Sequence, residues 1–307
     1  MLSRGPVYCL PALVRKAPTG KFTGCSIRRN SALPAAVRPR RVRPAGQFRC
    51  RECWTVEHLL SARRLEESIR LGGIMATRPI LMYHAVNCGV DPYNIQVSPQ
   101  RLRQQFSLIR HMGYRGVSVS RLLTPATSPE RLVGLTFDDG YADFLSEAVP
   151  LLGEFGFTAT VYMVAGLLGG RNEWDGPPLR PLLSMPDLAT VLSAGHEIGS
   201  HGMTHASLPG LPARELAYEV TESRRVLEDV LGTAVTGFCY PYGLHDARAV
   251  ALVSDQYEYA CAIHRSRDQG AWTLPRFFVS EADHPLRLAA KLVLRTSRQR
   301  VQALTSK

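Results

Sequence analysis

From Pro79 onward, the chain alternates between two patterns of hydrophobic and polar positions. Short runs of aliphatic, aromatic and β-branched residues are followed by segments in which apolar residues recur at helical spacing. This alternation is typical of βαβ units that build a parallel sheet. The pattern predicts strands over residues 80–83, 116–119, 133–137, 158–164, 197–200, 237–240 and 259–263.

Three segments between these strands carry signals for the beginning or the end of a helix. Ser98 and Pro99 begin one helix, which Gly113 closes, and Ser184 begins a second over 185–194. The third is expected over 212–231, with Gly232 ending it. About seven strands with helices between them predict an α/β fold, a deformed (β/α)7–8 barrel in a single domain over 78–285.

Charge separates the first 77 residues from the rest. They carry 15 Lys and Arg against 4 Asp and Glu, whereas residues 78–307 carry 22 of each. Because residues 1–51 contain no acid and 35–46 alternate Arg with Pro, we expect 1–77 to be a basic, disordered tail. Alternatives are an organellar transit peptide, half a zinc site at Cys50 and Cys53, or a misassigned start with Met75 as the true first residue. The neutral domain predicts no nucleic-acid partner.

The final segment, 286–307, has six basic residues and no acidic one. Leu288, Leu292 and Leu294 give it a weak apolar stripe, which predicts a helix that packs on the barrel or contacts a membrane surface. No apolar run reaches the roughly 18 residues that a membrane span needs, so a cytoplasmic protein is expected. Seven cysteines, an odd number, favour free thiols.

Polar or turn motifs follow four of the predicted strands at the same end. They are YH at 83–84, DDG at 138–140, SHGMTH at 200–205 and YPYG at 240–243. In a parallel barrel this end is the catalytic face. Two histidines and one carboxylate form a three-ligand metal set that leaves positions open for water. Gly202 stands where a zinc protease of the HExxH type has Glu, which argues against that class. The loop 166–183 is expected to shape the cleft.

Together, TFDDG (136–140), SHGMTH (200–205) and YPYG (240–243), with PILMYH (79–84) ahead of them, resemble the polysaccharide deacetylase family. This is the NodB-homology group, or carbohydrate esterase family 4. The opening motif is most similar to the branch that includes poly-N-acetylglucosamine deacetylases, in which the LxxH motif is permuted to the front. The resemblance implies a NodB-type barrel and a metal-dependent hydrolase. Its implied reaction removes an N-acetyl group from an N-acetylhexosamine-containing glycan, either a polysaccharide or a lipid-linked precursor.

The resemblance also implies a role for each matching residue. Asp139, His201 and His205 would bind a divalent metal, zinc by analogy, and Asp138 would be the general base. His84 would be the general acid that protonates the leaving amine. The backbone N–H of Tyr242 would stabilise the oxyanion.

Two positions depart from the family pattern. The family commonly has Arg in the third motif, beside the base, where this chain has Cys239. We expect Arg276, in the sequence LPR, to supply that charge. Gly202 replaces the usual Ser or Thr after the first metal histidine, which predicts a looser His201. Trp174 and Trp272 are candidates for stacking on sugar faces or for ordinary packing.

Other functions stay open at this point. The same scaffold and site are compatible with hydrolysis of O-acyl groups or of non-sugar amides. A glycan-binding module with a degenerate site is a further alternative, although the intact carboxylates and histidines argue against it. A two-histidine, one-carboxylate iron oxygenase is disfavoured by the order of the ligands.

Overall fold

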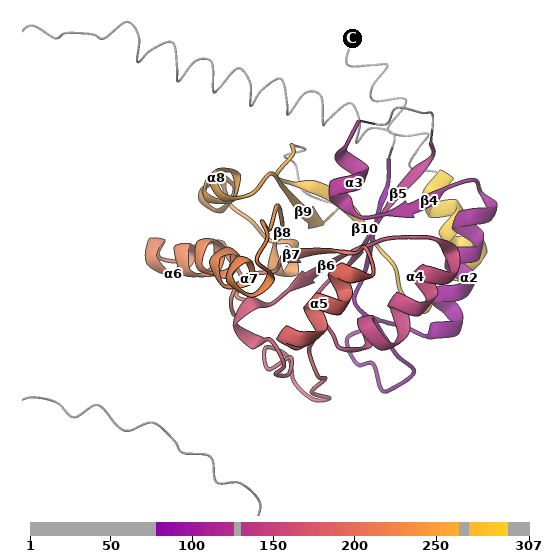
Figure 1. Ribbon diagram of the computed structural model, residues 1–307, viewed down its shortest axis with the longest axis horizontal. Coiled ribbons are helices and arrows are strands. Elements are labelled where there is room, and N and C mark those ends of the chain that lie inside the picture. The colour runs from indigo at the N-terminus through magenta and orange to yellow at the C-terminus, as the bar shows by residue number, and fades with distance from the viewer. Residues whose placement is uncertain (1–77, 126–129, 264–269, 294–307) are drawn as a thin grey trace, which may run out of the picture. The chain divides into compact units, whose positions relative to one another are not determined.

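The computed structural model describes residues 78–125, 130–263 and 270–293. Seven parallel strands in the described part close into a ring, whose order is β1, β10, β9, β8, β7, β6, β5 and back to β1. Helices lie around the outside of the strands (Figure 1). The strands are β1 (Ile80–Tyr83), β5 (Leu132–Phe137), β6 (Thr160–Met163), β7 (Glu197–Ser200), β8 (Gly237–Cys239), β9 (Tyr259–Ile263) and β10 (Leu274–Phe278). The predicted (β/α) barrel is therefore confirmed.

One predicted strand lies beside the ring. Strand β4 (Arg115–Val117) pairs with residues 132–134 of β5. Strand β6 pairs with residues 136 and 137, farther along β5. It ends two residues earlier than predicted because Ser118 is the N-cap of α3 (Val119–Leu123), where its side chain accepts from the N–H of Arg121 at 3.4 Å. Strand β10 was not predicted, since Pro275 and Arg276 interrupt its apolar run. A short parallel pair, β2 (Ala85–Val86) and β3 (Gln96–Val97), follows His84.

The three predicted helices are present, and one contains an irregular turn. Helices α2 (Pro99–His111) and α5 (Met185–Ser193) begin at the expected serine caps. The third is divided into α6 (Ala213–Ala217), the π-helical turn η3 (Tyr218–Glu222) and α7 (Ser223–Leu231). The remaining helical segments are η1 (Phe144–Ala148), α4 (Val149–Phe155), η2 (Ala165–Leu167), η4 (Pro241–Gly243) and α8 (Ala247–Gln256).

Alternate residues of the strands face two different hydrophobic clusters. Leu81, Val133 and Phe238 pack against the helices in the larger cluster. Their neighbours along the strands, Ile80 and Cys239 among them, form a smaller cluster that fills the barrel interior. A filled interior makes the barrel a rigid support, and it leaves the carboxyl ends of the strands as the place for a site.

Residues 285–293 are helical, and their buried leucines, Leu288 and Leu292, belong to the larger cluster. The apolar stripe of the C-terminal segment thus packs on the barrel, and nothing in the described part supports the alternative of membrane contact. No helix within 78–125, 130–263 and 270–293 is long and apolar enough to cross a membrane. The predictions for residues 1–77, including those for Cys50, Cys53 and Met75, concern residues outside the described part of the chain, as does the prediction for Leu294.

Candidate active site

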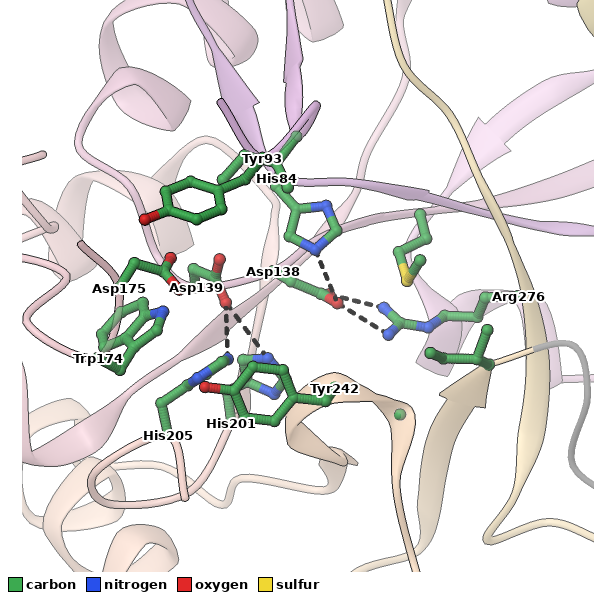
Figure 2. Close-up of a pocket in the computed structure, with 14 residues that line it drawn as sticks. His84, Tyr93, Asp138, Asp139, Trp174, Asp175, His201, His205, Tyr242 and Arg276 are labelled. Carbon is green, nitrogen blue, oxygen red and sulfur yellow. Dashed lines mark hydrogen bonds and ion pairs between the residues drawn. The ribbon is translucent and has the colours of Figure 1, made fainter. Parts of the chain in front are cut away.

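The four motifs singled out in the sequence meet at the carboxyl ends of the strands. Asp138 and Asp139 follow β5, His201 follows β7, and His84 follows β1. They line one cavity of about 250 Å³, together with His205, Tyr242 and Arg276. Figure 2 shows these side chains converging from different strands on the same space. The coincidence of polar motifs at one end of the barrel therefore corresponds to a real cluster.

Asp139, His201 and His205 form a compact set of donor atoms. The Oδ1 atom of Asp139 lies 3.4 Å from Nε2 of His201 and 3.2 Å from Nε2 of His205. All three side chains are buried, and their donor atoms lie within 4.8 Å of one another. Burial alone would raise the pKa of Asp139, but the hydrogen bonds from the two histidines outweigh it and hold that pKa well below its usual range. One carboxylate and two imidazoles fit a catalytic zinc site with open positions.

The two histidines are brought together by a loop and not by a helix. Gly202 has φ +85° and His205 has φ +65°, so the chain turns back on itself between the two ligands. His201 is oriented by its other ring nitrogen, because Nδ1 lies 2.7 Å from the carbonyl oxygen of Cys239 and can donate to it. That bond leaves Nε2 as the atom facing Asp139.

Asp138 is paired with a buried arginine, as the sequence suggested. Nη1 of Arg276 donates to Oδ1 of Asp138 at 2.6 Å, and Nη2 donates to Oδ2 at 2.8 Å. Burial alone would raise the pKa of Asp138, but the charge and hydrogen bonds of Arg276 outweigh it and lower that pKa below its usual value. The thiol of Cys239 lies 2.9 Å from Nη2. Burial raises the pKa of this thiol, which keeps it neutral. Arg276 thus places its positive charge against Asp138, and Cys239 packs beside it.

His84 lies on the opposite side of Asp138 from the histidine loop. Its Nε2 is 4.0 Å from Oδ2 of Asp138, and its side chain is 16% exposed at the cavity wall. Figure 2 shows the ring pointing into the cavity above Asp138. This position suits a group that acts on the same bound molecule as Asp138 from another side.

The aromatic candidates separate into two places. Trp174 stacks on the ring of His205, with centroids 4.5 Å apart and an angle of 25°. Tyr242 is 47% exposed at the cavity mouth and packs edge-on against the same ring at 4.6 Å. Trp272 belongs elsewhere: its Nε1 donates to the carbonyl of Tyr257 at 2.9 Å, and it lines a second cavity of about 910 Å³ that also contains Glu197. Because Glu197 begins its strand, that cavity lies at the amino ends of the strands, and the expected role of Trp272 at the site is corrected.

Sequence reasoning missed several residues that line the cavity. Asp175, next to Trp174, faces Asp139 in Figure 2, and burial together with the charge of Asp139 raises its pKa. Tyr93, from the loop after β2, lines the same cavity. Its hydroxyl lies close to Gly176, only 2.9 Å from the position that a Cβ on that glycine would take. The only available signal was the position of Trp174 and Asp175 within the loop 166–183, which does form part of the cavity.

Comparison with known proteins gives the same family. A family model described as polysaccharide deacetylase matches residues 126–261. YxkH of Bacillus subtilis, named for the polysaccharide deacetylases, is 27% identical over 213 residues, which cover 67% of this chain and 72% of that protein. A chitin deacetylase from a Pestalotiopsis species is 32% identical over 138 residues, which cover 45% of this chain and 42% of that protein. Proteins with these names are hydrolases of carbon–nitrogen bonds.

Solved structures show the same fold. The Streptococcus pyogenes deacetylase PplD, solved in complex with acetate, has a TM-score of 0.59 at 23% identity and covers 70% of this chain and 97% of its own. IcaB from Ammonifex degensii has the same TM-score at 22% identity, with the same coverage. These two likenesses concern the barrel itself. The matched family model, the relatives and the barrel agree with the motifs, and residues 126–261 form a domain that matches the polysaccharide deacetylase family.

Proposed function

We propose that this chain is a metal-dependent hydrolase that removes an N-acetyl group from a glycan containing N-acetylhexosamine. The observation that carries the proposal is the convergence of two different carboxylates in one cavity. Asp139 faces His201 and His205, whereas Asp138 is held by Arg276. One carboxylate is thereby placed for a metal ion, and its neighbour stays available for proton transfer.

The residues fit the chemistry of amide hydrolysis. Asp139, His201 and His205 would hold a divalent cation, which when bound would supply a Lewis acid to polarise a carbonyl and to lower the pKa of water. Asp138 then acts as the base that takes a proton from the attacking water, in an ionised state that Arg276 favours.

The remaining steps involve the other two residues of the site. His84, on the far side of Asp138, protonates the leaving nitrogen, and this proton lets the amine depart. The backbone N–H of Tyr242, at the cavity mouth, donates to the developing oxyanion. Both assignments follow the resemblance of PILMYH and YPYG to family motifs.

The proposed substrate is a polymer or oligomer of N-acetylglucosamine type, and support comes from the relatives. They include a chitooligosaccharide deacetylase of Sinorhizobium fredii, 28% identical over 47% of this chain, and a poly-beta-1,6-N-acetyl-D-glucosamine N-deacetylase of Escherichia coli, 36% identical over 22% of it. Trp174, Tyr242 and Tyr93 give the cavity mouth aromatic walls of the kind that pack on sugar rings.

The direct test is acetate release from N-acetylglucosamine oligomers by the full chain, first stripped of metal and then re-supplied with zinc. We expect release that requires zinc and that disappears in Asp138→Asn. The matched control is Asp229→Asn, which makes the same change in an exposed carboxylate on α7 and should leave release intact. Oligomer binding without release would indicate a glycan-binding module. Zinc binding without release would leave O-acyl or non-sugar amide substrates.

A further inference from the structure

The loop that carries the two candidate metal histidines has little regular structure of its own. Residues 201–205 lie between β7 and the next helix, and two of them have positive φ. The backbone N–H groups of such a loop need partners from elsewhere in the molecule. The N–H of His201 donates to the carbonyl of Met163 at 2.8 Å, and that of Gly202 approaches the hydroxyl of Ser200 at 3.3 Å.

The next two N–H groups both donate to one buried carboxylate. Oε2 of Glu219 accepts from Met203 N–H at 2.8 Å and from Thr204 N–H at 3.0 Å, and Oε1 accepts from the Thr204 hydroxyl at 2.6 Å. Glu219 is only 4% exposed. Hydrogen bonds to a charged acceptor are about twice as strong as neutral ones, so three of them on one carboxylate form a firm clamp.

Two local features are fitted to this clamp. Glu219 lies in η3, the π-helical turn, and such turns insert a residue that changes the direction of side chains. Gly202 is the other feature, since a Cβ there would lie 2.9 Å from Oε2 of Glu219. A Ser or Thr at this position would therefore have to displace the Glu219 carboxylate, and here Thr204 supplies a hydroxyl to that carboxylate. The expectation of a looser His201 stays a prediction.

The opposite side of the loop is also held. The N–H groups of Ala165 and Gly166 donate to the carbonyls of Gly202 and Met203, each at 2.9 Å. Glu219 on one side and the turn after β6 on the other thus fix the peptide units between the two histidines. Groups that fix metal ligands in this way typically change metal affinity 10- to 100-fold when they are removed.

We propose that Glu219 is a positioning residue that holds His201 and His205 in the geometry for metal binding. The role rests on the metal site of the proposed function, but it concerns affinity for the ion and is measured without any glycan. Glu219 contacts neither the donor atoms of the three metal-ligand residues nor the cavity. It acts through the backbone N–H groups of Met203 and Thr204.

The test is the zinc affinity of the full chain, measured by competition with a chromophoric chelator. Glu219→Met removes all three acceptor bonds and is expected to weaken zinc binding at least about tenfold. Glu219→Gln can accept from both N–H groups through its amide oxygen, and it should restore most of the affinity. Asp139→Ala measures zinc bound elsewhere, for example by the cysteines, and this background is subtracted.

Glu197 provides a matched control at the other end of the barrel. Its carboxylate also accepts three hydrogen bonds, from Ser120 N–H at 3.0 Å and from the hydroxyls of Thr160 and Tyr259 at 2.7 Å each. Glu197→Met should lower stability and leave zinc affinity within about twofold of the unaltered chain, because it lies far from the ligands. An equal loss of affinity in Glu197→Met would reduce the role of Glu219 to general stability.

The outcomes separate this role from the proposed function. A folded Glu219→Met chain that binds zinc as tightly as the unaltered chain overturns the role, even where acetate release is intact. Weak binding by Glu219→Met supports it, even where no acetate is released. If Glu219→Met does not fold, Thr204→Val removes one bond at an exposed residue, and unchanged zinc affinity in that variant counts against the role. A chain without zinc binding at the Asp139 site overturns both.

Discussion

Arg276 is the residue whose replacement tests the site most sharply. It is 1% exposed and makes a two-pronged contact with Asp138 at 2.6 and 2.8 Å, and it donates further to Thr136 at 3.0 Å. Arg276→Met keeps much of the side-chain volume and removes the charge. The change leaves the carboxylate of Asp138 buried without its counter-charge, while Asp139 and the two histidines keep their positions.

The expected size of the effect follows from burial. Removing one partner of a buried ion pair costs about 3–5 kcal/mol, and one pKa unit corresponds to about 1.4 kcal/mol, so the pKa of Asp138 can rise by at most about 2–4 units. In the unaltered chain this pKa is lowered, so the base is ionised at neutral pH. In the variant the lowering by Arg276 is lost, so the effect of burial weighs more and the pKa of Asp138 rises. The acid limb of the kcat/KM profile should therefore move to higher pH by at least about one unit. Turnover at pH 7 should fall by up to about tenfold, because a pKa that starts below its usual value and rises by at most about 4 units still leaves part of Asp138 ionised at that pH.

Two measurements on the same variant distinguish this account from simple damage. Zinc stoichiometry should stay at the level of the unaltered chain, because Arg276 touches none of the three metal residues. The loss of stability should shrink as the pH falls below the raised pKa of Asp138, because the protonated carboxyl no longer needs a counter-charge. Arg224→Met is the control, since it removes a half-buried arginine paired with Glu228 on α7 and should leave the pH profile unchanged. An Arg276→Met profile superimposable on that of the unaltered chain would refute the reasoning.

Three further predictions test single features of the site. Gly202→Ala and Gly210→Ala both place a side chain at positive φ, and each should lower the free energy of unfolding by about 1–2 kcal/mol, measured by thermal unfolding. Only Gly202 lies against Glu219, so only Gly202→Ala should also lose zinc affinity in a chelator competition. Cys239→Ala should leave turnover within about threefold in the acetate assay, a change below about 0.7 kcal/mol, because the thiol is neutral and the ion pair beside it is kept. Trp174→Ala should raise KM for oligomers, whereas Trp272→Phe should not, since Trp272 lines a different cavity.

The barrel could be predicted because its strands report burial directly. Runs such as 133–137 are buried at every position and apolar except for Thr136, as strands covered on both faces are, and the turn and cap residues around them are local signals. Strand β10 escaped because its side chains serve the site as well as the core. Pro275 and Arg276 break the apolar pattern, yet Arg276 reaches through the barrel interior to Asp138. A strand whose residues carry chemistry loses the hydrophobic signature by which strands are found.

The site could be predicted in its members but not in its supports. Asp138, Asp139 and the two histidines stand in short motifs that follow predicted strands at one end of the barrel and that resemble the motifs of a known family. Glu219 is 14 residues beyond His205 in a helix whose pattern gives it no special status, and only the π-helical turn aims it at the loop. Trp272 was predicted at the wrong end of the barrel, because the residues around it in the sequence carry no signal for the end at which its side chain lies.

Backbone conformation is the part of the site that the side-chain pattern hides most completely. Among the described residues, four non-glycine residues have positive φ, and three of them are Asp139, His205 and Tyr242. Such conformations cost about 1–3 kcal/mol each and persist where the surroundings hold them. The left-handed conformation at Asp139 directs the two adjacent carboxylates. On a straight strand they would face opposite sides of the sheet, whereas here Asp138 contacts Arg276 and Asp139 contacts the histidines. Asp139→Gly would relieve that strain but remove the ligand, so the surroundings must hold the turn. Two backbone hydrogen bonds flank it, from Asp138 N–H to the carbonyl of Tyr83 at 2.9 Å and from Leu183 N–H to the carbonyl of Gly140 at 2.8 Å.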